Sequence, residues 1–409
     1  MTVRLAPPKL LVDPAWERAV LGPFVDAARE ALARQLATGV AEIDPVPTLQ
    51  RAYRSVPFYQ QVFARAALGL ADLEDPRALA SIPITRRADV AARFTDLLVH
   101  PLPPFALERG WLGKTSGSTG APISYLRDPR THAWFWAFVD FARAYVGLQA
   151  PLREIVLLDS LAHLPEYEAE LPLLHDARFT KRSSAGDLGG LRAQVITGDP
   201  ESLAPLAGLE LPGVLVLSSA FAMPQGTRER LERTGATVLE YYATQETSVI
   251  AVQCRRQRGF HPLSGACLVE EAFGELVLTA THNPSFPLIR YAPGDHGSPT
   301  DDPCGCGLSG PRIAALDGRT NVRFPGRNGD FLAATVGPLL ARLPVEEHQL
   351  VWKAVDRYVL RVRGALPLDL RVLEARLVEL AGGPVHVTLE RVTTIPRAGS
   401  KPVPFLLDP

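Results

Sequence analysis

The chain has 409 residues, which is too long for one small hydrophobic core, so we expect one large and one smaller domain. It is 46% hydrophobic and 21% charged, as globular proteins are, and its formal net charge is −1. Since no long run of like charge occurs, the sequence offers no electrostatic footprint for nucleic acid or for an anionic membrane. The N-terminal residues lack the pattern of a signal peptide, and no apolar run approaches the ~20 residues that span a bilayer. We expect a soluble, cytoplasmic protein.

The chain begins with segments of helical periodicity. Apolar residues recur at helical spacing over 16–37 and 51–66, and the same pattern returns over 131–145. From about residue 151, short apolar runs alternate with helical or loop segments. These runs are Glu154–Leu158, Val214–Ser218, Thr237–Tyr241 and Gly274–Leu278. The alternation predicts an α/β fold with a buried sheet.

The character of the sequence changes beyond about residue 317. Glycines cluster there, and a compact unit follows in which 357–363 alternates as a strand, 369–380 is helical and 385–392 alternates again. We place a domain boundary at 317–321, which leaves a C-terminal domain of about 90 residues, near the lower end of domain sizes that fold alone.

A loop of six residues combines glycines with hydroxylated side chains. Its members are Thr115, Ser116, Gly117, Ser118, Thr119 and Gly120. Glycine lets backbone N–H groups converge on an anion, and the hydroxyl groups donate further hydrogen bonds, which suits phosphate. Such loops are more often flexible turns. Here the loop lies between a strand-like segment and the start of a helix, with partner motifs further along the chain, and we interpret it as a phosphate loop.

Several motifs, in this order, resemble the adenylate-forming superfamily, and in particular its phenylacetate–CoA ligase branch, which also contains indoleacetate–lysine ligase. The segments RSVPFY (54–59) and LASIPIT (79–85) resemble its N-terminal signatures, and TSGSTGAP (115–122) resembles its phosphate loop. The lysine that most of the superfamily has after this loop is Ile123 here, as is common in this branch. The resemblance covers nearly the whole chain. It implies a large N-terminal AMP-binding domain of mixed sheets and helices (1–317), a hinge (318–321) and a small, mobile α+β lid domain (322–409).

The segment that contains Tyr242, Gln245 and Glu246 resembles the family's nucleotide motif. The resemblance implies that Tyr242 stacks on adenine and that Glu246 holds Mg²⁺, which needs hard oxygen ligands. Gln245 replaces a threonine that contacts the α-phosphate, and its amide can still donate a hydrogen bond. The alternative is the end of a strand with a solvated glutamate.

The most extended match comprises GELVLT (274–279) and PLIRYAPGD (287–295) and ends on Asp295. The resemblance makes Asp295 the ribose ligand, since a carboxylate can accept hydrogen bonds from two hydroxyl groups at once. A turn-capping aspartate is the alternative. Upstream, Ser219 falls where the family has residues that line the adenine and acyl pocket, and this match is one of position only.

Cysteine and histidine residues form a candidate metal site in the second half of the chain. Cys254 and His261 have six residues between them, and Cys304 and Cys306 follow in a loop. Thiolates and imidazole are the ligands of a closed tetrahedral zinc site, although a lone cysteine or histidine is usually part of a core. The family resembles this chain in both halves of the pattern, and we predict a structural Zn²⁺. We expect Cys267 to be a buried thiol.

Two C-terminal segments resemble the mobile elements of the family. Residues 318–321, which include Arg319, resemble its hinge, and IPRAGSK (395–401) resembles the turn that carries its lysine, here Lys401. In the family this lysine neutralises charge that develops on the carboxylate and the α-phosphate, a preorganised electrostatic role. The alternative is a solvated lysine. The chain uses arginine for most of its basic residues, which favours a function for Lys401.

Aromatic side chains follow the phosphate loop on one helix face. They are Trp134, Phe138 and Phe141, with Phe135 and Trp136 alongside. Such a face usually packs in a core. Because the family prefers small and often aromatic acids, the resemblance also permits a pocket for an aromatic or cyclic acid.

The resemblance implies an acid–thiol ligase that converts ATP and a small carboxylic acid to an acyl-adenylate and then acylates coenzyme A. Arg357, Arg361 and Arg363 alternate on one strand and offer ligands for the phosphates of coenzyme A, or form a solvated edge. An amine or a carrier-protein thiol is an alternative acceptor. A protein that binds AMP without catalysis is an alternative function because of Gln245. Whether the chain forms a homodimer stays open.

Overall fold

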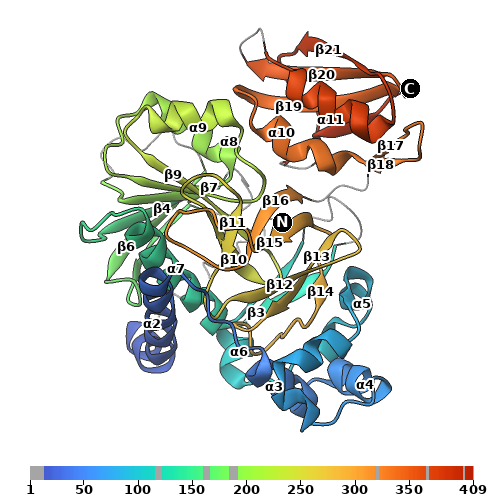
Figure 1. The fold of residues 1–409 in the computed structure, drawn as a ribbon. Helices are drawn as coiled ribbons and strands as arrows, with labels where there is room; N and C mark the ends of the chain where they lie inside the picture. The colour runs from blue at the N-terminus through green and yellow to red at the C-terminus, as the bar shows by residue number, and fades with distance from the viewer. Residues whose placement is uncertain are drawn as a thin grey trace, which may run out of the picture.

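The computed structural model describes residues 13–115, 122–159, 166–183, 192–318, 322–364, 368–398 and 401–408. They form a large N-terminal part and a small C-terminal domain with a sheet of its own, which is orange and red at the top of Figure 1. The predicted α/β architecture with a separate small C-terminal domain is confirmed.

Helices dominate the first hundred described residues. They are α1 Pro14–Trp16, the π-helical turn η2 Glu17–Leu21, α2 Gly22–Thr38, α3 Val46–Ser55, α4 Pro57–Arg65, η3 Asp72–Glu74, η4 Pro76–Ser81, α5 Arg87–Ala92, η5 Phe94–Leu97 and α6 Pro104–Arg109. The helical segment predicted over 16–37 is confirmed. The one predicted over 51–66 is wrong in being continuous, because Val56 is extended, with φ −118° and ψ 106°. A residue before proline avoids the helical region, so the chain turns at Val56 and forms two helices.

One mixed sheet runs through the N-terminal part. Its strands are β1 Thr85–Arg86, β4 Glu154–Leu158, β5 Tyr167–Leu171, β6 Ala177–Arg182, β7 Val195–Gly198, β8 Leu215–Ser218, β9 Thr237–Thr244, β10 Ser248–Gln253, β11 Phe260–Pro262, β12 Cys267–Ala272, β13 Glu275–Ala280, β14 Tyr291–Ala292, β15 His296–Thr300 and β16 Arg312–Gly318. Strands β6, β4, β7, β8 and β9 are parallel neighbours in that order. The predicted strand 154–158 is β4, and the other three predicted strands are β8, β9 and β13 with small shifts at their ends. The carboxyl ends of the parallel strands share one edge, where open α/β sheets place their ligands.

Two hydrophobic cores cover the two faces of the parallel strands. The covering elements are α7 Pro129–Tyr145 with α2 on one face, and α8 Pro200–Leu203, η7 Ala204–Gly208 and α9 Gln225–Glu232 on the other. The first core contains Ile155 and Leu217, and the second contains their sequence neighbours Val156 and Val216. Successive side chains of a strand point to opposite faces of the sheet. Because both faces are covered here, side chains on both faces of a central strand are buried, and the strand appears in the sequence as a continuous apolar run.

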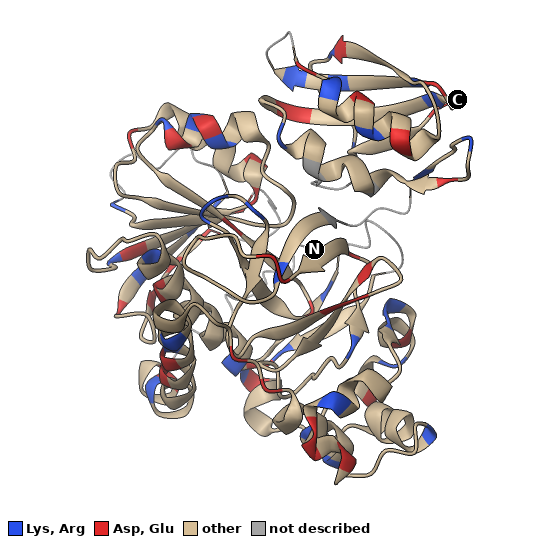
Figure 2. Ribbon diagram, viewed as in Figure 1, with Lys and Arg blue, Asp and Glu red and all other residues tan. Residues whose placement is uncertain are grey.

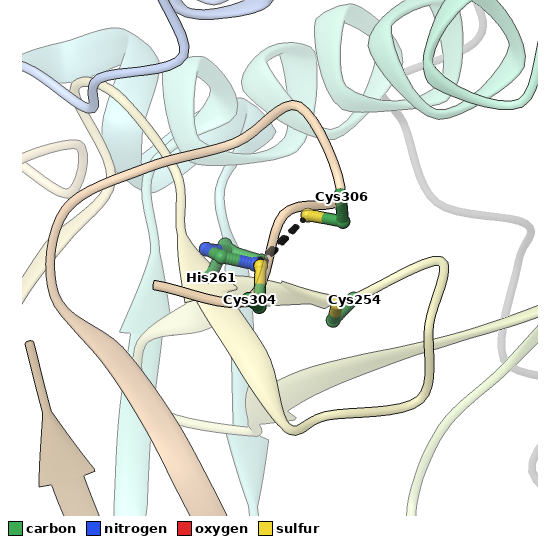
Figure 3. A group of neighbouring side chains, drawn as sticks. All are labelled: Cys254, His261, Cys304 and Cys306. Carbon is green, nitrogen blue, oxygen red and sulfur yellow. Dashed lines mark hydrogen bonds between the residues drawn. The ribbon is translucent and has the colours of Figure 1, made fainter. Parts of the chain in front are cut away.

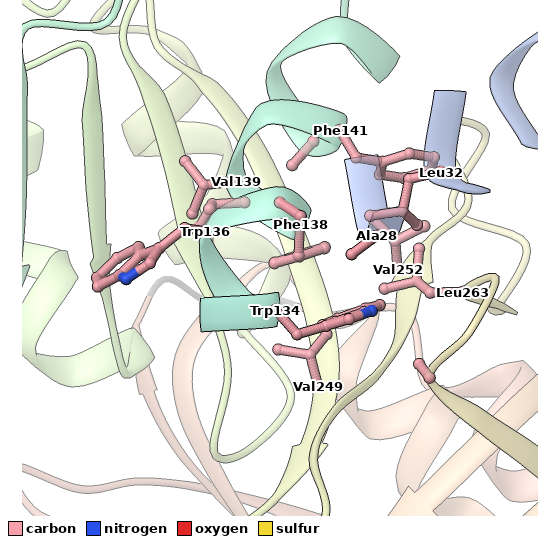
Figure 4. Close-up of a cluster of buried hydrophobic side chains, with 14 of the residues drawn as sticks. Ala28, Leu32, Trp134, Trp136, Phe138, Val139, Phe141, Val249, Val252 and Leu263 are labelled. Carbon is pink, nitrogen blue, oxygen red and sulfur yellow. The ribbon is translucent and has the colours of Figure 1, made fainter. Parts of the chain in front are cut away.

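The aromatic residues of α7 lie in the first core. Trp134, Phe138 and Phe141 are at most 3% exposed and share this core with Leu32 of α2 and Val252 of β10 (Figure 4). Their face of the helix therefore packs in the core, which is the commoner outcome for aromatic residues at helical spacing. These three side chains give no support to an aromatic acyl pocket.

The C-terminal domain has its own sheet and its own core. Its elements are β17 Arg323–Phe324, β18 Phe331–Leu332, η8 Ala333–Val336, α10 Gly337–Ala341, β19 Val345–Ala354, β20 Arg357–Gly364, α11 Arg371–Ala381, β21 His386–Arg391, β22 Arg397–Ala398, β23 Lys401–Pro402 and β24 Phe405–Leu407. The main sheet has the order β21-β20-β19-β24, and its core includes Tyr358, Leu377 and Phe405. The strand, helix and strand predicted after residue 357 are confirmed. Residues 319–321 lie outside the described residues, so the domain limits stay a prediction.

Charges of both signs are interspersed over the molecule (Figure 2). Many form short-range ion pairs, such as Arg34 with Glu30 and Arg376 with Glu379. Within the described ranges, no helix is both long and apolar enough to cross a membrane.

Candidate active site

The predicted phosphate loop joins the two strands of a hairpin, so a strand follows it and not, as expected, the start of a helix. These strands are β2 Trp111–Lys114 and β3 Ser124–Arg127. The N–H of Thr115 donates to the carbonyl of Ile123 at 3.0 Å, and Thr115 Oγ1 accepts from the N–H of Ile123 at 3.1 Å. The base of the loop is therefore fixed. The loop residues Ser116, Gly117, Ser118, Thr119 and Gly120 lie outside the described residues.

Glu246, the predicted Mg²⁺ ligand, is buried beside the base of this loop. Its Oε1 accepts hydrogen bonds from Arg87 Nη1 and from the Tyr291 hydroxyl, both at 3.0 Å. Arg87 Nη2 donates to Thr115 Oγ1 at 2.9 Å, so one guanidinium links the carboxylate to the phosphate loop. Glu246 Oε2 is buried and has no hydrogen-bond partner among the described residues. An unpartnered buried carboxylate oxygen costs free energy, and a bound cation would remove that cost.

The sheet explains how Arg87 reaches this position. Strand β1 pairs in parallel with β14, with Thr85 opposite Tyr291. Arg87 follows β1 directly as the first residue of α5, so the pairing brings its side chain to the Tyr291 hydroxyl and the Glu246 carboxylate. A guanidinium with five donors can serve both the carboxylate and the loop at once.

Asp295, the predicted ribose ligand, lies beside Tyr242, the predicted adenine residue. The Tyr242 hydroxyl donates to Asp295 Oδ2 at 2.6 Å, and both residues are buried. The backbone carbonyl of Asp295 accepts a hydrogen bond from the N–H of Leu276 at 2.8 Å, which ties the turn to β13. Gly294 before it has a φ of +85°, a conformation that glycine adopts without strain. The fold thus joins two predicted residues that are 53 positions apart in the chain.

Gln245 contacts β3, the strand that follows the phosphate loop in the chain. Its Oε1 accepts hydrogen bonds from the Tyr125 hydroxyl at 3.0 Å and from Arg127 Nη2 at 3.3 Å. Arg127 Nε also donates to the backbone carbonyl of Gln245 at 2.9 Å. Since the oxygen of the amide serves as an acceptor here, its Nε2 is the group that can donate to a ligand.

Ser219 lies at the same edge of the sheet. It follows β8, and its N–H donates to the carbonyl of Gly198, the last residue of β7, at 3.2 Å. Because β8 and β9 are parallel neighbours, Ser219 and residues 242–246 lie at the same end of adjacent strands. This position suits a residue that lines a ligand pocket.

Lys401, the predicted adenylation lysine, begins β23, which forms a hairpin with β22. The backbone pairing sets Lys401 opposite Ala398. The side chain of Lys401 and the predicted hinge residue Arg319 both lie outside what the structure describes. The hairpin contacts the N-terminal part through Arg397, which forms an ion pair with Glu201 of α8.

All three arginines considered for coenzyme A lie near carboxylates of their own domain, and the Arg357 pair, with Asp356 at an N–O distance of 4.0 Å, is the longest. Arg361 pairs with Glu390 at an N–O distance of 3.0 Å, and Arg363 pairs with Glu346 at 2.7 Å. The Arg357 side chain is 71% exposed. In this arrangement of the chain, Arg357 is the most accessible of the three to a phosphate group.

The candidate metal ligands converge between three strands (Figure 3). Cys254 follows β10, His261 lies in β11, and Cys304 and Cys306 lie in the loop before β16. All four are buried, and their ligand atoms lie within 4.8 Å of one another. His261 Nε2 is 3.3 Å from the sulfur atom of Cys304 and 3.3 Å from that of Cys306, and these two sulfur atoms are 3.1 Å apart. Cys267 is apart from this group, in β12, and burial raises the pKa of its thiol.

The protonation of His261 is the one that a metal ligand requires. Burial, with Arg312 nearby, lowers the pKa of His261 to about 4, which keeps the imidazole neutral, the form that binds metals. Burial raises the pKa of the Cys304 thiol to about 11, so a metal ion has to displace its proton. The Tyr145 hydroxyl donates to Cys306 Sγ at 3.4 Å and orients that sulfur. Three sulfur atoms and one imidazole nitrogen are the donor set of a structural zinc site.

Sequence reasoning did not identify Arg87, Tyr291 or Tyr125. Tyr291 stands inside the segment that resembles the ribose motif, but only the fold shows that its hydroxyl contacts Glu246. One signal for Arg87 was available. Most of the superfamily that the sequence resembles has a lysine where this chain has Ile123, so a phosphate site here would need a cation from another segment.

No protein-family model and no curated protein matches the sequence. The fold does match solved structures. A 2-hydroxyisobutyryl-CoA ligase in the postadenylation state, in complex with 2-HIB-AMP, aligns over 100% of this chain and 94% of its own, with 17% identity and a TM-score of 0.64. In an open conformation with 2-HIB-AMP and CoA, that ligase aligns over 100% and 97% with 16% identity and a TM-score of 0.56. In the thioesterification state with the same ligands, it aligns over 100% of this chain and 94% of its own, with 17% identity and a TM-score of 0.52.

This similarity defines the class of fold. The chain has the fold of an adenylate-forming acyl-CoA ligase, and the predicted resemblance to that superfamily is confirmed at the level of the fold. Of the three states of the 2-hydroxyisobutyryl-CoA ligase, the arrangement of this chain is most similar to the postadenylation state.

Proposed function

We propose that the chain is an acid–thiol ligase that uses ATP to convert a small carboxylic acid to an acyl-adenylate and then transfers the acyl group to coenzyme A. One observation carries the proposal. Two predicted nucleotide residues, Tyr242 and Asp295, contact each other, and Glu246 is joined through Arg87 to Thr115 at the base of the phosphate loop. Each of these groups offers what one part of ATP requires.

The Tyr242–Asp295 pair suits the nucleoside. The ring of Tyr242 offers a face for adenine, while its hydroxyl holds the Asp295 carboxylate in one orientation. A carboxylate fixed in this way can accept hydrogen bonds from ribose hydroxyl groups without losing further freedom.

Arg87 and Glu246 suit the phosphates. We infer that Arg87 supplies the positive charge that the lysine replaced by Ile123 supplies elsewhere in the superfamily, since a guanidinium binds phosphate oxygens in pairs. Glu246 Oε2 would hold Mg²⁺, which neutralises phosphate charge when bound. Arg87 can then donate to Glu246 and to a phosphate through different nitrogen atoms.

In the first half-reaction, a carboxylate oxygen of the acid attacks the α-phosphorus of ATP and the bond to pyrophosphate breaks. Lys401 stabilises the negative charge that develops there, and the amide of Gln245 donates to the α-phosphate. In the second, the C-terminal domain (322–409) rotates about a hinge at 318–321, and the thiolate of coenzyme A attacks the acyl carbon and releases AMP. The neighbouring ligase with CoA in its thioesterification state supports coenzyme A as the acceptor.

We propose a small aromatic or cyclic acid as the substrate. The support for this acid is the family resemblance alone, since the aromatic residues of α7 belong to the core and do not form a pocket for it.

We further propose that four residues hold one structural Zn²⁺, namely Cys254, His261, Cys304 and Cys306. The ion would join the β10–β11 turn to the loop before β16. Since ATP and coenzyme A are intracellular, we expect the enzyme to act in the cytoplasm.

Acid-dependent exchange of labelled pyrophosphate into ATP tests the first half-reaction. The purified protein is offered a panel of aromatic, cyclic and short aliphatic acids with Mg²⁺. Exchange with at least one acid supports the proposal. If AMP or ATP binds but no acid supports exchange, the chain is a nucleotide-binding protein without this activity.

A competition on preformed acyl-adenylate tests the acceptor. Coenzyme A, hydroxylamine, an amino acid and a carrier-protein thiol are supplied at matched concentrations, and the products are identified by mass. We expect the coenzyme A thioester to form fastest. If an amine or a carrier thiol reacts faster, the protein is an amide synthetase or a carrier-loading enzyme and not a coenzyme A ligase. The proposed adenylation step would not be affected by that result.

A further inference from the structure

Ion pairs join the C-terminal domain to the N-terminal part in both directions. Arg397 of β22 contacts Glu201 of α8, and it also contacts Glu347 of its own domain. In the opposite direction, Arg230 of α9 reaches Glu346 of β19 at an N–O distance of 3.0 Å. Each domain thus contributes one arginine that pairs with a glutamate of the other.

The backbone is in close contact at the same interface. A side chain at Gly226, the second residue of α9, would lie 2.9 Å from the carbonyl oxygen of Val345 and 3.0 Å from the carbonyl carbon of Pro344. The start of β19 therefore packs directly on α9, as Figure 1 shows, and α9 carries charges of both signs there (Figure 2).

These pairs are suited to a contact that forms and breaks. The Arg397 and Glu201 side chains are 30% and 41% exposed, and an ion pair with such access to water contributes little to stability. Arg397 and Glu347 belong to the same domain, so their ion pair can persist when that domain separates from α8. The separation takes Arg397 away from Glu201, a partly exposed carboxylate that water can solvate.

Arg397 also lies at the base of the hairpin that carries Lys401. In the backbone pairing, Arg397 stands opposite Pro402 and Ala398 opposite Lys401. The N–H of Val403 donates to the carbonyl of Pro396 at 2.8 Å and closes the hairpin behind them. An anchor on Arg397 consequently fixes the backbone from which Lys401 extends.

We propose that Arg397 is a positioning residue for acyl-adenylate formation: through Glu201 it docks the β22–β23 hairpin on the N-terminal part and so places Lys401 for that half-reaction alone. The inference rests on the proposed function. The higher similarity to the postadenylation state than to the thioesterification state of the 2-hydroxyisobutyryl-CoA ligase agrees with a docked arrangement of this kind.

The test separates the two half-reactions. Arg397→Glu places a carboxylate against Glu201 and is expected to slow acid-dependent pyrophosphate exchange about 10-fold, while thioester formation from supplied acyl-adenylate stays within about twofold. Arg397→Gln and Glu201→Gln are each expected to slow exchange about 2- to 5-fold, and the double variant no more than Arg397→Gln alone, because both changes remove the same Arg397–Glu201 ion pair. Arg397→Lys should retain most of the exchange rate. Arg376→Gln removes an ion pair with Glu379 inside the C-terminal domain and should change neither half-reaction.

Hydrogen exchange measured by mass spectrometry gives a readout that does not depend on activity. In Arg397→Glu, the amides of residues 396–403 should exchange faster than in the unmodified protein, and those of β20 should not. Unchanged exchange in this hairpin, additive losses in the double variant or equal loss of both half-reactions would each overturn the role of Arg397. If the unmodified protein catalyses no pyrophosphate exchange with any acid, the proposed function fails instead, and the hydrogen-exchange result still decides whether Arg397 docks the hairpin.

Discussion

The two regions that would meet in acyl-adenylate formation are held in different ways. In the N-terminal part, Tyr242, Asp295 and Glu246 are buried and bonded to neighbouring residues of one sheet. In the C-terminal domain, the hairpin of Lys401 touches the N-terminal part through the partly exposed ion pair of Arg397 with Glu201. Burial fixes the first region as the protein folds. Water competes for the second contact, so that contact can break while both domains stay folded, as a rotating lid requires.

The largest effects should come from the buried region. Asp295→Ala and Glu246→Ala are each expected to abolish acid-dependent pyrophosphate exchange, because each removes the carboxylate proposed to bind the ribose or Mg²⁺, beside Tyr242 and Arg87 respectively. Asp301→Ala, a change at an exposed position of a nearby loop, is the control. Circular dichroism checks that the variants fold. Exchange at the unmodified rate in either variant would remove that residue from the proposed site.

The mobile region should show a divided response. Lys401→Ala is expected to slow adenylation by roughly 10²- to 10³-fold, the cost of losing one preorganised charge-stabilising group. Thioester formation from supplied acyl-adenylate should survive, because the lysine acts in the first half-reaction only. Lys353→Ala, which removes an ion pair with Asp408 in the same domain, should leave both steps unchanged. Equal loss of both half-reactions in Lys401→Ala would indicate general damage.

Arg87 gives a further test of the buried region, because it joins Glu246 to Thr115. Arg87→Ala should slow pyrophosphate exchange by roughly 10- to 100-fold, the equivalent of losing charge-assisted hydrogen bonds worth about 1.5–3 kcal/mol. The adjacent Arg86→Ala provides the control, since the Arg86 side chain is 45% exposed and pairs with Glu275 away from Glu246. The Michaelis constant for ATP should rise in the first variant only. Similar losses in the two variants would argue against a phosphate-binding role.

The smallest effect on catalysis is expected at the candidate zinc site, for which we propose a structural role. Protein prepared without chelator should carry about one zinc per chain, the content of a closed site with three cysteines and one histidine. Cys304→Ser should lower both the zinc content and the Tm. Cys267→Ser changes a buried thiol outside the cluster and should keep the zinc. Metal-free protein by elemental analysis would contradict the zinc proposal.

Local pattern determined much of the fold. Strand β4 was predicted at its observed bounds, and α7, β8, β9 and α11 were predicted to within a few residues, because a buried strand or an amphipathic helix needs an apolar pattern that the sequence shows directly. The sequence analysis did not predict the break at Val56, because the helical periodicity continues across Pro57. The proline itself was a signal for that break. Motif resemblance identified Tyr242, Glu246 and Asp295 as candidates, but it did not predict the hydrogen bond from Tyr242 to Asp295 or the one from Arg87 to Glu246.

The amino-acid pattern was enough to predict the α/β class, the separate C-terminal domain, the candidate nucleotide residues and the four candidate zinc ligands, because each has a local pattern or a motif. Three features became evident from the folded structure: Arg87 pairs with Glu246 across 159 positions, the aromatic residues of α7 pack in the core, and Arg397 contacts Glu201. The physical reason is the same in each case. An ion pair or a core contact between distant segments depends on how the strands are ordered in the sheet and on how the domains meet, and neither leaves a periodic signal in the chain.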